Sequence, residues 1–159
     1  MYLNKRKVIL VISISALVFF FTYKDIKSQD IQVTDADTIK INGEKIRFSG
    51  IDAPELKQFC VIENIKNSCG LKAKQILVDK IGNFEITCIR EGKDQYKRTL
   101  AECFVNDESL SRYLVKRGYA FAYRKYSDKF IKDEDYARLK KVGMWSMKFE
   151  YPWDFRRNN

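Results

Sequence analysis

Residues 38–55 read TIKINGEKIRFSGIDAPE, and this stretch decides how the chain folds. The pair Asn42-Gly43 lies between two runs in which apolar and polar residues alternate, which is the strongest short signal for a two-residue β-hairpin. In the second run Ile46 and Phe48 point to one face of the strand, so Arg47 points to the other. A glycine-proline turn follows, and we expect it to carry the next two acidic side chains out of the sheet.

Working outward from this hairpin, the same alternation predicts one strand before it and two strands after it. A helix of residues 69–81, which Ser68 can cap, separates the third strand from the fourth. Five short strands with a helix after the third are typical of the OB-fold, so we expect an α+β domain with a five-stranded OB-fold β-barrel and three helices. The expected strands cover residues 31–35, 38–42, 44–50, 83–91 and 99–105, and the other two helices run from Asp107 to Arg117 and from Ser127 to Val142.

The N-terminus has the composition of an export signal. Three basic residues, 5–7, precede an almost wholly apolar stretch of residues 8–23, which is the pattern of a signal peptide or a signal anchor. The stretch is slightly shorter than the roughly 20 residues that span a bilayer comfortably, and no A-x-A-type cleavage site follows it. Cleaved and uncleaved forms both stay open at this point. In either case we expect the folded part to be exported, either anchored in the membrane and facing the periplasm or the extracellular side, or secreted.

Behind residues 1–23 the chain divides into three further parts. We expect a linker at residues 24–30, one OB-fold domain at residues 31–146 and a C-terminal tail at residues 147–159. The last sixteen residues hold both tryptophans of the chain and one of its prolines, so we expect the tail to pack on the domain.

Net charge and the absence of one residue type narrow the function. The chain has 159 residues, a net charge of +9 and no histidine. A basic excess favours polyanionic partners such as nucleic acid or an anionic membrane surface. The lack of histidine excludes sites built on a histidine base, on histidine metal ligands or on a Ser-His-Asp triad. Acid-base chemistry must then fall to carboxylates, Lys, Tyr, Cys or metal-bound water.

The four cysteines agree with an oxidising compartment. Cys60, Cys69, Cys88 and Cys103 form an even set without the CxxC spacing of zinc and redox sites. Three pairings are possible. Cys88 and Cys103 lie on two predicted strands joined by a hairpin and can face each other, in which case Cys60 and Cys69 close a short loop. Four buried thiols are the alternative.

Two aspartates follow predicted strands and are candidates for a cation site. Asp37, in the motif DADT, follows the first strand, and Asp52 follows the third. If the strands form a meander, their ends converge and the two carboxylates can share one hard cation. Two carboxylates, a backbone carbonyl and waters make a weak oxygen-rich site, which suits Ca²⁺ at affinities of about 0.1–1 mM.

Two arginines complete a set that suits a phosphate. Arg47 lies on the strand before Asp52, and the later hairpin loop DQYKR supplies Tyr96 and Arg98. The guanidinium is a planar fork that matches two phosphate oxygens and stays protonated. Two arginines near one cation and one free carboxylate, Glu55, therefore indicate a site that binds and attacks a phosphodiester.

With these residues in place, the chain resembles the staphylococcal nuclease family. The similarity runs over DADT, IRFSGIDAPE, DQYKRTLA, LVKRGYAFAYRKY and the GMW after the third helix, and an exported bacterial branch of the family is also similar through ELKQFC, CG and PWDFRR. One such motif has little weight, but the whole set in order at domain-wide spacing is specific. The resemblance implies a Ca²⁺-dependent endonuclease on an OB-fold barrel that cuts DNA and RNA with little sequence specificity and leaves 3′-phosphate ends.

The resemblance also implies roles for the acidic residues. Asp37 and Asp52 match the carboxylates that bind the metal, and Ala53 stands where the family offers a backbone carbonyl to the same metal. Glu55 matches the carboxylate that activates or positions the attacking water.

The basic and aromatic residues match the family in the same way. Arg47 and Arg98 match the two arginines that clamp the phosphate and act in catalysis. Tyr96 and Tyr123 match tyrosines that contact the substrate, and Tyr126 is expected to share that role.

The chain departs from the family pattern at three positions. Ala36 stands between the two aspartates of DADT where a glycine is usual, and Lys97 stands before Arg98 where a glycine is usual. Gln95 replaces a base that many members carry. None of these changes removes a catalytic group.

Two other functions are open to such a chain. The first is a non-catalytic OB-fold module that binds nucleic acid, which would have no need of the complete set of acidic and basic residues. The second is a membrane-tethered structural protein, which accounts for residues 1–23 but not for that set. A monomer is the expected oligomeric state.

Overall fold

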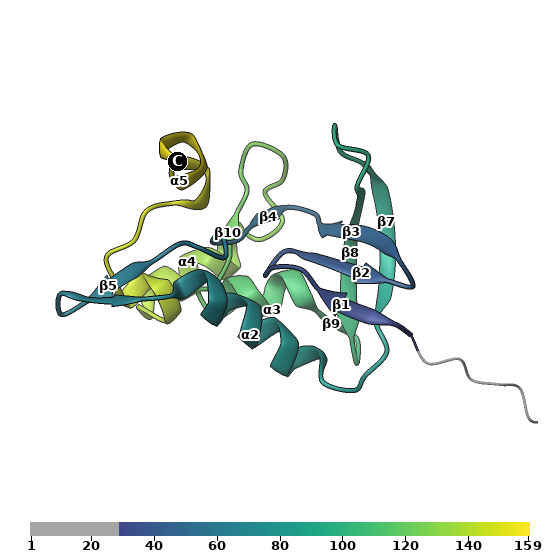
Figure 1. Cartoon of the computed structure of the whole chain (residues 1–159), viewed down its shortest axis with the longest axis horizontal. Helices are drawn as coiled ribbons and strands as arrows, with labels where there is room; N and C mark the ends of the chain where they lie inside the picture. Colours follow the sequence, from purple (N-terminus) through teal and green to yellow (C-terminus); the bar gives the residue numbers. More distant parts are fainter. Residues whose placement is uncertain (1–28) are drawn as a thin grey trace, which may run out of the picture.

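A computed structural model describes residues 29–159 of the chain (Figure 1). The predicted signal segment, residues 1–23, and residues 24–28 of the predicted linker lie outside the described residues. Within residues 29–159, no helix is both long enough and apolar enough to cross a membrane.

The predicted α+β class with an OB-fold barrel is confirmed. Strands β2 and β3 pair antiparallel, β3 and β8 pair parallel, and β8 and β7 pair antiparallel. A short strand, β9 (Glu108–Ser109), extends the sheet beside β8. Along the sheet the order is β1 (Ile31–Val33), β2 (Thr38–Ile41), β3 (Glu44–Phe48), β8 (Thr99–Val105) and β7 (Thr87–Lys93).

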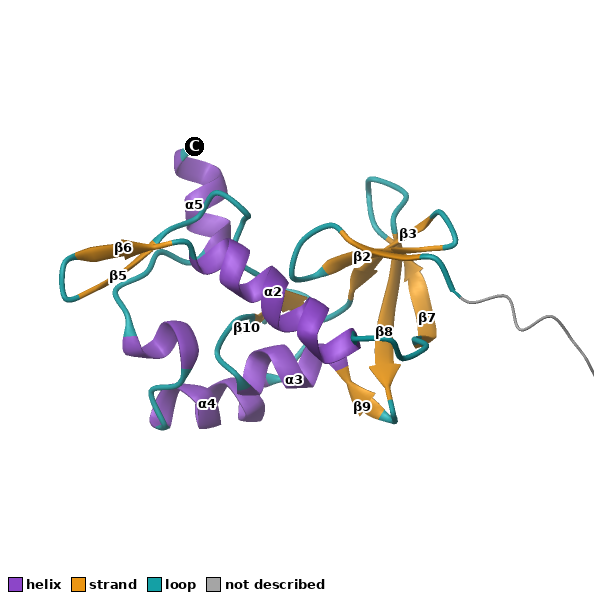
Figure 2. Ribbon diagram, turned by 60° about the horizontal axis from the view of Figure 1, so that its bottom comes forward, coloured by secondary structure: helices purple, strands orange, loops and turns teal. Residues whose placement is uncertain are grey.

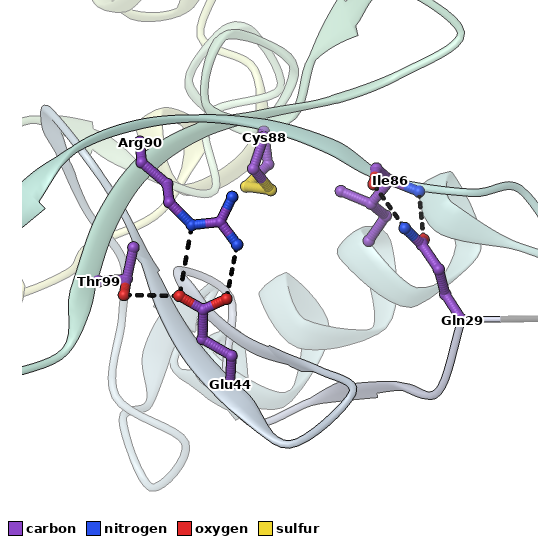
Figure 3. The surroundings of a disulfide bond; sticks show 7 residues. Gln29, Glu44, Ile86, Cys88, Arg90 and Thr99 are labelled. Atoms are coloured by element: carbon purple, nitrogen blue, oxygen red, sulfur yellow. Dashed lines mark hydrogen bonds and ion pairs between the residues drawn. A yellow bond between two sulfur atoms is a disulfide. The ribbon is translucent and has the colours of Figure 1, made fainter.

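A side chain links the two edge strands of this sheet (Figure 3). Just before β1, the amide nitrogen of Gln29 donates to the carbonyl of Ile86 at 2.9 Å, and the Ile86 backbone N–H donates to the Gln29 amide oxygen at 2.7 Å. Ile86 lies immediately before β7. The Gln29 amide thus links the residue before β7 to the chain just before β1, at the two edges of the sheet.

Side-chain hydrogen bonds also join β3, β7 and β8, on the other side of Cys88 from Gln29 in Figure 3. Glu44, the first residue of β3, accepts hydrogen bonds from Arg90 Nη2 at 2.6 Å and from Thr99 Oγ1 at 2.8 Å. The hydrogen bonds from Arg90, together with its positive charge, hold the pKa of Glu44 below its usual value. The Arg90–Glu44 pair is exposed, so it contributes little to the stability of the barrel.

The β2–β3 hairpin forms at the predicted position. Asn42 and Gly43 both have positive φ, 51° and 84°, which is the conformation of a type I′ turn and the reason for the Asn-Gly preference. Ile39 lies opposite Ile46 in the ladder, and both side chains are buried in the core. Thr38 lies opposite Arg47, which brings DADT beside the third strand.

The first helix matches its predicted range. α2 (Cys69–Ile81) buries Ala73, Leu77 and Ile81, which are spaced by four residues and therefore lie on one face. Ser68 is at the N-cap position but makes no side-chain cap hydrogen bond. Figure 2 shows α2 running from the side of the β5–β6 hairpin to the barrel near β9, where Lys80 pairs with Glu108.

The second and third helices are shorter than predicted. Asn106 and Asp107 have positive φ, 48° and 61°, and form the turn between β8 and β9, so α3 (Leu110–Lys116) begins only after Ser109, whose hydroxyl accepts from the Arg112 N–H. α4 (Ile131–Leu139) ends before Lys141, which has a left-handed φ of 50°.

Several elements were not predicted. A small hairpin of β5 (Cys60–Ile62) and β6 (Ile65–Asn67) forms in a segment expected to be irregular. A two-residue strand, β4 (Ile51–Asp52), pairs with β10 (Phe121–Ala122). The expectation that a turn carries Asp52 out of the sheet is therefore wrong. A 3₁₀ turn, η1 (Gly143–Ser146), lies just before the tail, and the tail contains a fourth helix, α5 (Pro152–Asn158).

Aromatic side chains hold the C-terminal tail on the domain. Phe121 of β10 is wholly buried at the centre of this cluster. Its ring lies 5.1 to 6.1 Å from four other rings, mostly edge to face, which is the favoured geometry for aromatic pairs. Those rings belong to Trp145, Phe149, Tyr151 and Trp153. The tail is thus packed over the strand pair β4–β10.

All four cysteines are paired. Cys60 bonds to Cys69 with their Cα atoms 5.7 Å apart, which ties β5 to the start of α2. Cys88 bonds to Cys103, and these residues are directly opposite in the β7–β8 ladder. These are the two pairs expected if Cys88 and Cys103 face each other on neighbouring strands.

Candidate active site

A cleft of about 1070 Å³ opens on one side of the barrel. The β7–β8 loop, the β10–α4 loop and α5 project to the same side of the molecule around β4 (Figure 1), and each contributes residues to the cleft. Eight of the nine residues predicted to bind metal, act in catalysis or contact substrate line it: Asp37, Arg47, Ala53, Glu55, Tyr96, Arg98, Tyr123 and Tyr126. The ninth, Asp52, is wholly buried and lies behind the arginines of the cleft.

Arg47 joins the two predicted metal carboxylates. Its Nη1 pairs with Asp37 Oδ1, and its Nη2 pairs with Asp52 Oδ1 at 2.9 Å. Burial alone lowers the pKa of Arg47, but the charges and hydrogen bonds of Asp37 and Asp52 outweigh it, and the pKa is raised. Burial raises the pKa of Asp52, against the opposing effect of the arginines. One partly buried positive charge thus holds two buried carboxylates together.

Hydrogen bonds fix the orientation of Asp37. Its Oδ2 accepts from the backbone N–H of Ala53 at 3.0 Å, and its Oδ1 accepts from the Thr38 hydroxyl at 2.9 Å. The Asp37 N–H in turn donates to Asp35 Oδ1 at 3.0 Å. Burial, and then the neighbouring charge of Asp37, raise the pKa of Asp35 to about 6. The Ala53 contact links DADT to the DAPE turn, which are 16 residues apart.

A tight turn positions Glu55 at the edge of the cleft. The Glu55 N–H donates to Gln58 Oε1 at 3.2 Å, and the Gln58 N–H donates back to the Glu55 carbonyl at 2.8 Å. Gln58 is buried, and its Nε2 also donates to the Glu150 carbonyl of the tail. This positioning role could not be predicted, because a lone glutamine after a turn gives no signal in the sequence.

Gly70 leaves room for the backbone that carries Glu55. A Cβ atom at Gly70 would lie 1.8 Å from the Glu55 carbonyl oxygen and 3.0 Å from the Leu56 Cα. These are backbone atoms, so a side chain at this position must push the turn aside. The CG motif of the sequence therefore has a steric reason.

We expect Gly70→Ala to displace the Glu55 turn. The free energy of unfolding should fall by about 1–3 kcal/mol, the usual cost of overpacking, and the nuclease activity that the resemblance implies should fall with it. Thermal unfolding and a cleavage assay measure the two effects. Lys72→Ala, an exposed change on the same helix, is the control, and equal behaviour of the two variants would contradict the steric role of Gly70.

Asp94 organises the loop that carries Arg98 and Tyr96. Asp94 Oδ1 accepts from the backbone N–H groups of both residues at 2.9 Å, and its Oδ2 accepts from Arg98 Nε at 2.6 Å. Partial burial raises the pKa of Asp94, but the hydrogen bonds from Arg98 lower it more. The guanidinium of Arg98 also lies 5.5 Å from the centre of the Tyr96 ring. Asp94 thus aims Arg98 into the cleft.

Ala36 and Lys97 stand where the family usually has glycine, and their backbone conformations differ. Ala36 is buried in the core and is not among the residues of 29–159 that have positive φ, so an alanine fits without strain. Lys97 has a φ of 63°, a conformation that costs an L-residue about 1 kcal/mol and costs glycine nothing. The loop keeps its shape because Asp94 bonds to both neighbours of Lys97.

The predicted substrate tyrosines surround the mouth of the cleft. Tyr96 and Tyr126 are 71% and 68% exposed. Tyr123 is partly buried, and its ring lies 4.9 Å from that of Tyr126 and parallel to Trp153 at 6.1 Å. Tyr123 also lines a second cavity of about 510 Å³, beside Tyr151, Trp153, Arg124 and Lys125.

One arginine of the cleft was not predicted as a site residue. Arg156 of α5 donates from Nη2 to Asp52 Oδ2 at 2.6 Å and from Nη1 to Asp52 Oδ1 at 3.2 Å. Its Nη1 also donates to Glu55 Oε1 at 2.8 Å. The motif PWDFRR marked the tail as similar to one branch of the family, but it carried no indication that an arginine from the tail reaches the carboxylates.

The residues present suit a hard divalent cation. Asp37, Asp52 and the Ala53 carbonyl offer only oxygen, which Ca²⁺ prefers over nitrogen or sulfur. The guanidiniums of Arg47 and Arg156 are stand-in cations on these carboxylates. Within residues 29–159 no group of three or more Asp, Glu, Cys or His residues is close enough to hold a metal ion. A site here would therefore rest on two carboxylates, a backbone carbonyl and water, as the sequence predicts.

Comparison with known proteins identifies what this cleft resembles. Residues 45–147 match the family described as staphylococcal nuclease homologue. This span includes Arg47, Asp52, Glu55 and Arg98, and it ends before α5.

Similar proteins come from bacteria and plants. The chain is 29% identical over 154 residues to an uncharacterized endonuclease of Haemophilus influenzae, and the match covers 89% of this chain and 79% of that protein. It is 32% identical over 133 residues to the SPbeta prophage-derived endonuclease YokF of Bacillus subtilis, covering 72% of this chain and 42% of YokF. It is 30% identical over 117 residues to the staphylococcal-like nuclease CAN1 of Arabidopsis thaliana, covering 72% of this chain and 33% of CAN1.

Proposed function

Because the chain belongs to the staphylococcal nuclease homologue family, we propose that it is a Ca²⁺-dependent endonuclease that hydrolyses phosphodiester bonds in DNA and RNA and leaves 3′-phosphate ends. The family and the endonucleases among the relatives support phosphodiester hydrolysis. The single observation that carries the proposal is the cleft lined by Asp37, Glu55 and three arginines, with the buried Asp52 paired to two of those arginines from behind.

Neutralising the phosphate is the first task of the site, since a phosphodiester anion repels a nucleophile. Ca²⁺, held by Asp37, Asp52 and the Ala53 carbonyl, would supply positive charge to a phosphate oxygen. Arg47 and Arg98 both line the cleft. Arg98 would bind a remaining phosphate oxygen, and Arg47 would do so once the cation takes over the charges of Asp37 and Asp52, with which it pairs in the structure. Their hydrogen bonds strengthen as charge builds up in the pentacoordinate transition state, and this difference accelerates the reaction.

Glu55 is the base of the proposed mechanism. It is the carboxylate of the cluster that reaches solvent, with 39% of its side chain exposed, whereas Asp37 and Asp52 are buried. It can therefore hold a water and accept its proton as the water attacks phosphorus in line with the leaving 5′-oxygen. No histidine is needed, in agreement with the composition of the chain.

The exposed rings suit substrates without a fixed sequence. Tyr96 and Tyr126 border the cleft with most of their ring surface accessible. Every base has a flat face, so stacking on tyrosine binds single strands with little sequence preference. Basic side chains of the cleft, Lys45 and Lys93, add attraction for the backbone.

A non-catalytic OB-fold binding module is the other candidate. The buried carboxylate pair argues against it, because burying two acidic side chains is costly and binding a polyanion gains nothing from them. A binder of nucleic acid would be favoured by losing these acidic residues. The nuclease accounts for both the carboxylates and the arginines.

We also propose that the folded domain works outside the cytoplasm as a monomer. The apolar residues 8–23 support export, with either a membrane anchor or secretion as the result, and the pairing of all four cysteines suits an oxidising compartment.

End-group analysis tests the proposed products. The purified full-length chain is incubated with Ca²⁺ and 5′-labelled DNA or RNA oligonucleotides, and the products are treated with a phosphatase specific for 3′-phosphates. We expect fragments from both substrates to lose a phosphate. Fragments with 3′-hydroxyl ends would contradict the proposed class of mechanism.

Arg98 has a testable role of its own. We expect Arg98→Ala to lower the cleavage rate by roughly 10²–10³, by analogy with the loss of one donor from an oxyanion hole. Asp94→Asn keeps Arg98 but loses the ion pair that aims it, so we expect a smaller loss in the same direction. Steady-state cleavage rates measure both. A loss below about fivefold for Arg98→Ala would remove Arg98 from the catalytic set, since one such donor normally contributes far more.

A further inference from the structure

The C-terminal helix α5 places the positive charge of Arg156 beside Asp52, a proposed cation ligand, and Glu55, the proposed base. Arg156 is 104 residues from Asp52 and 101 from Glu55 along the chain, yet it forms hydrogen bonds to both. The contact with Asp52 uses two nitrogens on two oxygens, the fork geometry that makes arginine–carboxylate pairs strong. Asp52 has no exposed surface, so this pair is shielded from water on the aspartate side.

Packing holds Arg156 in this position. The tail that leads to α5 is docked by the ring of Phe121 against Tyr151 and Trp153. Upstream, Lys148 and Val61 form a β-bridge through hydrogen bonds of 2.8 and 2.9 Å. The neighbouring Arg157 instead pairs with Asp154 within α5 at 2.6 Å and is largely exposed. Two consecutive arginines thus have different environments, and only the first reaches the cleft.

We propose that Arg156 is an internal counter-ion of the active site, which occupies both oxygens of Asp52 and one of Glu55 and competes with the divalent cation and the attacking water for them. This inference rests on the proposed function. Oδ1 of Asp52 also accepts from Arg47, so a cation gains an unoccupied oxygen of Asp52, Oδ2, only when Arg156 releases it, and Glu55 can accept a proton only on an oxygen that Arg156 leaves free. Through Arg156, the tail therefore lowers the affinity of the site for its cation.

Removing the competitor should tighten cation binding. Arg156→Gln removes the positive charge from Asp52 and Glu55. The glutamine side chain retains part of the packing of the arginine. We expect the dissociation constant for Ca²⁺, measured by calorimetry on the full-length chain without nucleic acid, to fall about tenfold. Arg157→Gln removes the same charge from the same helix and should leave the constant unchanged.

The alternative is that Arg156 supports the site rather than competing for it. In that case Arg156→Gln would bind Ca²⁺ as the wild type does or more weakly, and the inference would be overturned while the nuclease proposal stands. If neither the wild type nor the two variants bind Ca²⁺ at millimolar concentration, both proposals fail.

A second variant covers the event that Arg156→Gln does not fold. Arg156→Lys keeps the charge and most of the aliphatic stem but loses the fork, so we expect an intermediate dissociation constant. Luminescence of bound Tb³⁺, which replaces Ca²⁺ in oxygen sites, provides an independent reading for all variants. A constant for Arg156→Lys that equals or exceeds that of the wild type would also overturn the inference.

Discussion

Arg47→Ala should lose both activity and stability. The activity loss should be roughly 10²–10³, because one fixed donor to the transition state disappears. The stability loss has a separate origin. Asp37 and Asp52 are buried and share this guanidinium, and a buried charge without its partner costs about 3–5 kcal/mol. Since Asp52 keeps Arg156, we expect the lower end of that range, about 3 kcal/mol.

Two measurements separate these effects. Thermal unfolding with EGTA gives the stability loss, and the same measurement with Ca²⁺ should show a smaller loss, because a bound cation neutralises the same carboxylates and stabilises the folded state. Arg90→Ala on β7 removes an exposed pair with Glu44 and should cost less than about 1 kcal/mol. Arg47→Lys keeps the charge without the fork, so it should fold and remain poorly active. An active Arg47→Ala enzyme would contradict the role of Arg47.

Glu55→Gln should leave a folded protein with very weak cleavage. The substitution keeps the size of the side chain and removes its ability to accept a proton, so we expect a rate loss of about 10²–10⁴, the range for a general base. Ca²⁺ binding should stay near normal, because Asp37, Asp52 and the Ala53 carbonyl are the proposed ligands.

Cleavage rates at saturating Ca²⁺ and calorimetric Ca²⁺ titrations test the two parts of this prediction. Glu63→Gln, in the exposed turn between β5 and β6, is the matched control and should behave as the wild type. Unchanged turnover in Glu55→Gln would remove Glu55 as the partner of the water. Loss of Ca²⁺ binding would instead make Glu55 a ligand.

Local signals predicted the barrel and most of the cleft. The Asn42-Gly43 turn and the alternation on either side of it fix the β2–β3 register, and this register places Thr38 beside Arg47. DADT lies between β1 and β2 and DAPE follows β3, so the pairing of β2 with β3 brings their carboxylates to the same side of Arg47. Each of these steps depends on residues close together in the sequence, which is why the sequence was sufficient.

Long-range packing decides what the sequence did not reveal. Arg156 reaches Asp52 only because the ring of Phe121 docks the tail, and nothing near Arg156 in the sequence points to that contact. The burial of Asp52 has a similar cause, since β4 exists only through its pairing with β10, about 70 residues further along. The helix boundaries failed for a local reason, because left-handed residues such as Asp107 and Lys141 end or delay the helices without a glycine.

A cleavage assay with and without free Ca²⁺ tests the central claim most directly. The purified full-length chain is mixed with single-stranded and duplex DNA at millimolar Ca²⁺, and EGTA is then added in excess. The nuclease account predicts that both DNAs are cut and that cutting stops on chelation. Binding of DNA without any cleavage at millimolar Ca²⁺ would contradict it and would favour the non-catalytic OB-fold module.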